Sequence, residues 1–231
     1  MQRGRDQNLD IHAWIVGLIA AFLFMLALFD GDLLIARHFF FDTATQEWIG
    51  RHEWWANELL HTGGRNLMRL VGVLAILAWV TSFKWRRLAT HRAELGYFAT
   101  CMVLVPLTVG FLKQVTNVDC PWDIQGFGGT MPLVHWFELR PAGLPHAACF
   151  PGAHSSSAFA LFGLFFVWRV TRPTLAMLAL LGTLILGALF SLAQQSRGAH
   201  FLSHDLVSAM LAWVICLGLY RFGGLHDAKR L

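Results

Sequence analysis

The sequence QQSRGAHFLSHD at residues 194–205 separates two long apolar runs. It holds one arginine, two histidines and one aspartate. An ionisable side chain near a bilayer is energetically costly, so it is retained where it faces protein, water or substrate. His200 and His204 are four residues apart and would share one face if the segment were helical. This segment therefore predicts a functional site where two membrane helices meet.

Two other segments are polar in the same way. Residues 113–121 follow one apolar run, and residues 149–156 precede another. We expect all three segments to meet on one side of a membrane and to bind a phosphate group.

The composition is typical of an integral membrane protein. Of the 231 residues, 56% are hydrophobic and 14% are charged, and the mean hydropathy is +0.52. Soluble domains carry about 25% charged residues. The net charge of +4 arises from basic residues in short loops between apolar runs, which indicates membrane topology and not a nucleic-acid partner. Without repeats or long linkers, residues 1–231 are predicted to form a single domain.

Six apolar runs predict an all-α bundle of six transmembrane helices. Several runs are shorter than the roughly 20 residues of a spanning helix, but each can be extended by a flanking turn. The first run lacks a following small-residue cleavage site, so we expect an uncleaved helix. The second carries Arg69, which is unusual in a spanning helix. The runs cover residues 13–29, 67–83, 95–112, 156–170, 174–193 and 206–220.

The distribution of Lys and Arg predicts that both termini are cytoplasmic. With the N-terminus inside, the cytoplasmic segments, which include Lys229 and Arg230, hold 11 basic residues and the outer segments hold 6. The three polar segments then lie on the outer side, so we expect a multi-pass protein of the bacterial inner membrane with a periplasmic active site. The first outer loop, residues 30–66, contains Trp48, Trp54 and Trp55 and predicts an interfacial amphipathic segment packed on the bundle.

The segment at 149–156 predicts an anion site at the start of a helix. Gly152, Ala153 and Ser155 would let backbone N–H groups approach a phosphate. His154 would lie beside it and could donate a proton to a leaving oxygen, and Lys113 would supply a point charge. The alternative is an ordinary helix cap with an incidental histidine and a lysine at the membrane interface.

The three segments resemble the motifs of the type-2 phosphatidic acid phosphatase superfamily, which includes bacterial acid phosphatases and vanadium haloperoxidases. The family pattern is Lys-x6-Arg-Pro, then Pro-Ser-Gly-His, then Ser-Arg-x5-His-x3-Asp. Their order, their spacing and the six-helix frame are similar to those of the membrane-bound branch. This chain has Lys113-x6-Cys120-Pro121, then Pro151-Gly152-Ala153-His154, then Gly198-Ala199-His200 followed by His204-Asp205.

The resemblance implies a lipid phosphatase that works without a metal or another cofactor. His200 would be the nucleophile that forms a phosphohistidine, His154 would protonate the leaving group, and Lys113 would bind phosphate oxygens. A carboxylate one turn away would hold the neutral imidazole in one tautomer. The other residues that we expect around the phosphate are Arg197, Gly152, Ala153, Ser155 and His204.

The sequence also departs from the family pattern. Cys120 and Gln194 replace two arginines, and Arg197 is a candidate to replace one of the lost charges. The position of the family aspartate is occupied by His204, with Asp205 one residue later. We expect Asp205 to orient His200, with His204 as the alternative orienting residue. A second alternative makes His204 the nucleophile.

Cys120 and Cys149 each precede a proline of a phosphate-binding motif, on the outer, oxidising side of the predicted topology. A disulfide between them would close a loop of roughly 30 residues and stabilise the protein by about 3–4 kcal/mol. Two unpaired thiols are the alternative.

Three other functions compete with lipid phosphate or diphosphate hydrolysis. A phosphotransferase of the same family would pass the phosphate to a lipid hydroxyl. A zinc site would use His200, His204 and nearby ligands, although the usual glutamate after the first histidine is missing. A non-enzymatic lipid or anion carrier would be expected to place its ionisable groups near the bilayer midplane, whereas here they lie at helix ends.

Overall fold

The computed structural model describes residues 3–135, 137–223 and 225, and it is mostly helical. Lys229 and Arg230, which the predicted topology counts as cytoplasmic, lie outside these residues. The long helices are α1 (Arg3–Leu28), α3 (Gly64–Thr81), α5 (Arg92–Thr116), α8 (Pro173–Ser196) and α9 (Leu202–Phe222). The short elements are α2 (Gly31–Phe39), the strands β1 (Phe41–Asp42) and β2 (Glu47–Trp48), the π-helix η1 (Trp55–Gly63), α4 (Arg86–Ala89), the 3₁₀ turn η2 (Pro121–Asp123), α6 (Ala153–Phe159) and α7 (Phe162–Trp168).

Five of the helical segments are long and apolar enough to cross a membrane, so the expectation of six spans is met for five. They are Ile11–Leu28, Trp55–Thr81, Arg92–Asp123, Pro173–Ser196 and Leu202–Phe222. The span predicted at 156–170 is instead the shorter apolar segment Ala153–Trp168, interrupted between α6 and α7. Sixteen residues of helix reach about 24 Å at 1.5 Å per residue, which is less than a typical hydrocarbon core.

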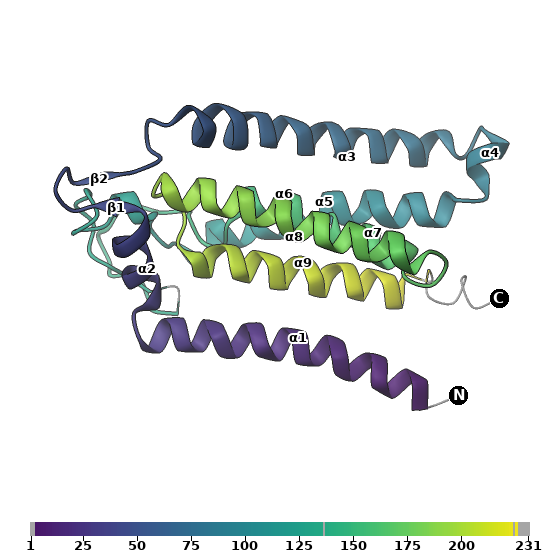
Figure 1. The fold of residues 1–231 in the computed structure, drawn as a ribbon, viewed down its shortest axis with the longest axis horizontal. Coiled ribbons are helices and arrows are strands. Elements are labelled where there is room, and N and C mark those ends of the chain that lie inside the picture. The colour runs from purple at the N-terminus through teal and green to yellow at the C-terminus, as the bar shows by residue number, and fades with distance from the viewer. Residues whose placement is uncertain (1–2, 136, 224, 226–231) are drawn as a thin grey trace.

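The long helices run side by side, and the loops that carry the three polar segments gather at one end (Figure 1). The first described residues of α1, the end of α9 and α4 all lie at the opposite end. The core is formed by α5, α6, α7, α8 and α9, with Phe166, Phe190 and Cys216 almost fully buried. Many large apolar side chains on α1, α3 and α8 are exposed, as expected for helices that face lipid.

The segment 30–66 is part of a second, smaller core and not only an interfacial cover. Trp48 is 2% exposed, stacks on Phe127 and donates its Nε1–H to the Phe127 carbonyl oxygen at 3.1 Å. It also packs against Gly198, where an added Cβ would lie 2.4 Å from the indole ring. Trp54 is 65% exposed and fits the predicted interfacial surface. Through these contacts of Trp48, the segment 30–66 covers the end of the bundle at the turn between α8 and α9.

Three helix boundaries differ from the predicted runs in ways that affect the site. Helix α3 continues backwards through η1, so Arg65 lies inside a candidate span and not in a loop. Helix α5 ends at Thr116, because the next residue, Asn117, has a left-handed φ of 55°, and Lys113 is in its last turn. Helix α8 ends before Gly198, whose φ of 77° is left-handed. His200 therefore lies in a loop, and the helical face shared with His204 is not formed.

Candidate active site

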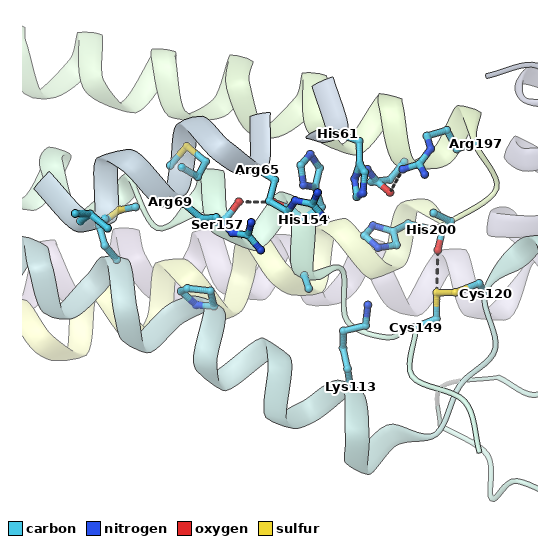
Figure 2. Close-up of a pocket in the computed structure, with 18 of the residues that line it drawn as sticks. His61, Arg65, Arg69, Lys113, Cys120, Cys149, His154, Ser157, Arg197 and His200 are labelled. Atoms are coloured by element: carbon cyan, nitrogen blue, oxygen red, sulfur yellow. Dashed lines mark hydrogen bonds between the residues drawn. A yellow bond between two sulfur atoms is a disulfide. The ribbon is translucent and has the colours of Figure 1, made fainter. Parts of the chain in front are cut away.

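A cavity of about 640 Å³ opens at the loop end of the bundle between α3, α5 and the start of α6 (Figure 2). It brings together residues from η1, from each of these helices and from the turn after α8. Its polar lining consists of His61, Arg65, Arg69, Lys113, His154, Ser157, Gln194, Arg197 and His200.

His200 is held by Asp205 at the base of this cavity. The Asp205 carboxylate is 2% exposed, and its Oδ1 lies 2.9 Å from His200 Nδ1. Asp205 also accepts hydrogen bonds from Ser155 Oγ at 2.7 Å and from Gln195 Nε2 at 3.2 Å. A carboxylate that accepts three hydrogen bonds is fixed in place, so Nδ1 of a neutral His200 carries the proton and Nε2 carries the lone pair.

Gly152 leaves the space that the pair of His200 and Asp205 occupies. An added Cβ would lie 2.6 Å from Asp205 Oδ1 and 2.9 Å from His200 Nδ1. The Gly152 N–H donates to the His204 carbonyl oxygen at 3.0 Å. Ser155 donates a hydrogen bond to Asp205. Gly152 and Ser155 therefore both help to hold the pair of His200 and Asp205 in place. Of the predicted anion-binding residues at the start of this helix, Ala153 lines the cavity.

His154 lies across the cavity from Lys113 and faces His61 (Figure 2). Its Nε2 is 3.0 Å from the Leu60 carbonyl oxygen, an acceptor, so Nε2 carries a proton and Nδ1 is the other nitrogen available for chemistry. The ring stacks on Phe190 with centroids 4.4 Å apart and lies 4.9 Å from the His61 ring.

The cavity carries a strongly positive charge. Arg65, Arg69, Lys113 and Arg197 line it, and no Asp or Glu is among its described lining residues. Burial lowers the pKa of the Arg197 guanidinium from its ordinary value, but arginine remains charged at neutral pH. Cations without facing carboxylates are suited to a polyanionic ligand.

Cys120 and Cys149 are joined by a disulfide that forms part of the cavity wall, with Cα atoms 5.1 Å apart. Cys149 Sγ lies 2.9 Å from the Ala199 carbonyl oxygen, next to His200. The disulfide thereby ties the loop after α5 to the start of α6 beside the histidine.

His204 is not brought to the cavity. It is 2% exposed on the first turn of α9, and its ring contacts the rings of Phe150 and Phe201. Within the described part of the chain, no three His, Cys, Asp or Glu side chains are grouped so that they could hold a metal ion.

A family model described as the PAP2 superfamily matches residues 94–226, more than half of the chain. The chain belongs to the PAP2 superfamily. Membership supports a phosphatase-type activity for this PAP2 protein, in agreement with the three sequence motifs. No curated protein and no solved structure matches the chain.

The PAP2 motifs do not include several residues that the fold brings to the site. His61, Arg65 and Arg69 come from η1 and α3, before the matched region, and Ser157 follows the second motif. The sequence contains a signal for Arg65 and Arg69. They are four residues apart at the start of an apolar run, so they would share one face of a helix. His61 had no comparable signal.

Proposed function

We propose that this protein is a membrane enzyme that removes phosphate from lipid phosphates or diphosphates through a phosphohistidine on His200. The observation that carries the proposal is the fixed pair of His200 and Asp205 beside a cavity lined by four cations. One end of the cavity suits a phosphate, and the other end is apolar.

In the first step, the Nε2 lone pair of His200 attacks phosphorus while the bond from phosphorus to the lipid oxygen breaks. Asp205 accepts the Nδ1–H of His200 and stabilises the imidazolium character that develops on the ring. His154 acts as the acid in the imidazolium form, which the negative charge of the bound phosphate favours; its Nδ1–H passes to the leaving oxygen while its Nε2–H stays on the Leu60 carbonyl oxygen. Lys113, Arg65 and Arg197 stabilise the negative charge on the equatorial oxygens of the phosphoryl group. These donors are in position before the reaction starts, which makes such stabilisation effective.

In the second step, water attacks the phosphohistidine and the bond between Nε2 and phosphorus breaks. His154, now neutral, takes a proton from the water, and inorganic phosphate leaves. A lipid hydroxyl in the place of this water would make the enzyme a phosphotransferase, so access of the acceptor determines the outcome.

The apolar part of the cavity supports a lipid substrate. Met68, Gly72, Val73 and Ile76 on α3 face Met102 and Pro106 on α5, and these residues continue the cavity away from His200. An acyl or isoprenoid chain there would exchange apolar contacts with lipid for apolar contacts with these side chains, so the fit of the chain to the cavity determines how well it binds. The headgroup would remain at the charged end.

We place the enzyme in a bacterial inner membrane as a single multi-pass domain with cytoplasmic termini and a periplasmic site. The support is the clustering of the polar segments at one end of the bundle, while Arg86 and Arg87 of α4 lie at the other end (Figure 1). This arrangement agrees with the excess of basic residues in the predicted cytoplasmic loops.

The test is phosphate release from a panel of lipid phosphates in detergent micelles with EDTA present, comparing the wild type with His200→Ala. We expect release by the wild type and none by the variant, and an acid-labile phosphoryl group on the wild type after rapid quenching. Release that requires an added divalent metal, or an unchanged rate in His200→Ala, would overturn the proposal.

A further inference from the structure

His61 lies in the active-site cavity but outside every PAP2 motif. It is at the C-terminal end of η1, is half-buried, and lines the cavity together with His154 and His200. Figure 2 shows its ring on the same side of the cavity as Arg197, extending towards His200. A π-helix is rare and often marks a functional position in a helix. Here η1 presents the Leu60 carbonyl oxygen to His154 and the His61 ring to Gln194.

A chain of two hydrogen bonds fixes the His61 ring. Arg197 Nη1 donates to Gln194 Oε1 at 3.1 Å, and Gln194 Nε2 lies 2.9 Å from His61 Nδ1. A guanidinium only donates, so the amide oxygen of Gln194 faces Arg197 and its NH₂ group faces His61. His61 Nδ1 is therefore the acceptor, and the proton of the neutral ring is on Nε2.

The hydrogen bond between Gln194 and His61 is formed at a position where the family pattern has a charged residue. The PAP2 pattern has an arginine at position 194, where this chain has a glutamine that is 2% exposed. The buried amide cannot itself supply a charge, but it orients a donor. Arg65 and Arg197 both lie within electrostatic range of His61, so an anion beside Nε2–H would also be attracted by two guanidinium groups.

We propose that His61 is a phosphate-binding residue, whose Nε2–H donates to a phosphate oxygen and is held in that tautomer by Gln194. This inference rests on the proposed phosphatase function and adds a ligand of the phosphate group that the family pattern does not contain. Its role is binding, with no proton transfer, so it acts on the substrate and on free phosphate alike.

The experiment measures binding of inorganic phosphate in the absence of turnover, as the shift in thermal unfolding temperature on titration with phosphate. Wild type and His200→Ala are both expected to be stabilised by phosphate. His61→Ala is expected to bind about tenfold more weakly, because one hydrogen bond to a charged oxygen is lost and water replaces part of it. The competitive inhibition constant of phosphate in the lipid assay should rise by a similar factor, with a larger change in KM than in kcat.

The partner residue gives the second measurement. Gln194→Met keeps the volume but removes both hydrogen bonds, and it is expected to weaken phosphate binding to a similar degree as His61→Ala. In the double variant the two losses should not add, because both remove the same donor. His38→Ala, an exposed histidine of α2 outside the cavity, is the matched control and should bind phosphate as the wild type does.

Unchanged phosphate affinity in His61→Ala would overturn the inference, and so would fully additive losses in the double variant. Partial recovery in His61→Gln, whose amide again offers an N–H, would support it. A failure of the phosphatase proposal would be seen in a different measurement. The wild type would then not hydrolyse lipid phosphates, whatever the phosphate affinity of His61→Ala.

Discussion

Asp205 Oδ1 lies 2.9 Å from His200 Nδ1 although the two residues are five positions apart and only Asp205 is in a helix. The turn at Gly198 carries His200 back over the first turn of α9, where Asp205 faces it. The His204 ring is 5.9 Å from the His200 ring between centroids, but it packs against Phe150 and Phe201 and does not line the cavity. This geometry favours Asp205 over His204 as the residue that orients His200.

The first prediction compares these two residues. Asp205→Asn should lower kcat by about 100-fold or more, because an amide can turn its NH₂ group to His200 Nδ1 and stabilise the tautomer that lacks a lone pair on Nε2. His204→Asn should reduce the unfolding temperature, since a buried ring is lost, and should leave kcat much closer to that of wild type. Both kcat and KM are measured on one lipid phosphate in micelles.

A larger loss of kcat in His204→Asn than in Asp205→Asn, with both proteins folded, would contradict this assignment and return His204 to the site.

The second prediction concerns Gly152. Gly152→Ala would place a methyl group 2.6 Å from Asp205 Oδ1, so the pair of His200 and Asp205 must move. A displacement of about 1 Å in a catalytic group is enough to lower the rate about 100-fold. The matched control is Gly182→Ala in the middle of α8, where an added Cβ meets no atom within 4 Å. The measurement is kcat together with the unfolding temperature, and equal activities of the two variants would show that Gly152 is not needed for the geometry.

The long helices can be predicted from the apolar runs in the sequence, and the motif residues can be predicted from their local spacing. The predicted run at 174–193 corresponds to α8, and that at 206–220 corresponds to α9, each extended by a few residues at its ends. The bundle also brings Lys113, His154 and His200 to one cavity from three separate segments.

Other parts of the site depend on contacts between distant segments and could not be predicted. The start of α3 is fixed by packing of Gly64 on Phe190, where an added Cβ would lie 2.5 Å from the ring, and this packing brings Arg65 to the cavity. The hydrogen bond of His61 with Gln194 joins residues 133 positions apart. The sequence gives no local signal for such a pair.

The third prediction concerns the disulfide between Cys120 and Cys149. The double variant Cys120→Ser/Cys149→Ser should lose about 3–4 kcal/mol of stability, since the bond closes a loop with a sequence separation of 29 residues. Activity should fall with it, because the disulfide is part of the cavity wall beside His200. Dithiothreitol should have the same effect on the wild type and on Cys101→Ala/Cys216→Ala, which lacks only the two free, buried cysteines. Peptide mapping without reductant that finds free thiols at both positions would refute the pairing.

The last prediction tests the apolar part of the cavity. Gly72 lines it on α3, and an added Cβ there meets no atom within 4 Å, so a larger side chain would occupy open space without disturbing the helix. Gly72→Leu should lower kcat/KM for a long-chain lipid phosphate about tenfold or more, which is about 1.4 kcal/mol, because the leucine side chain would fill the space that the lipid chain needs. A short, water-soluble phosphate ester should be hydrolysed at the wild-type rate. Gly110→Leu on α5, which also has open space around it but is outside the cavity lining, should leave both rates unchanged. Equal losses on both substrates in Gly72→Leu would instead mean that the leucine disturbs the catalytic residues, and no loss on either would place the lipid chain elsewhere.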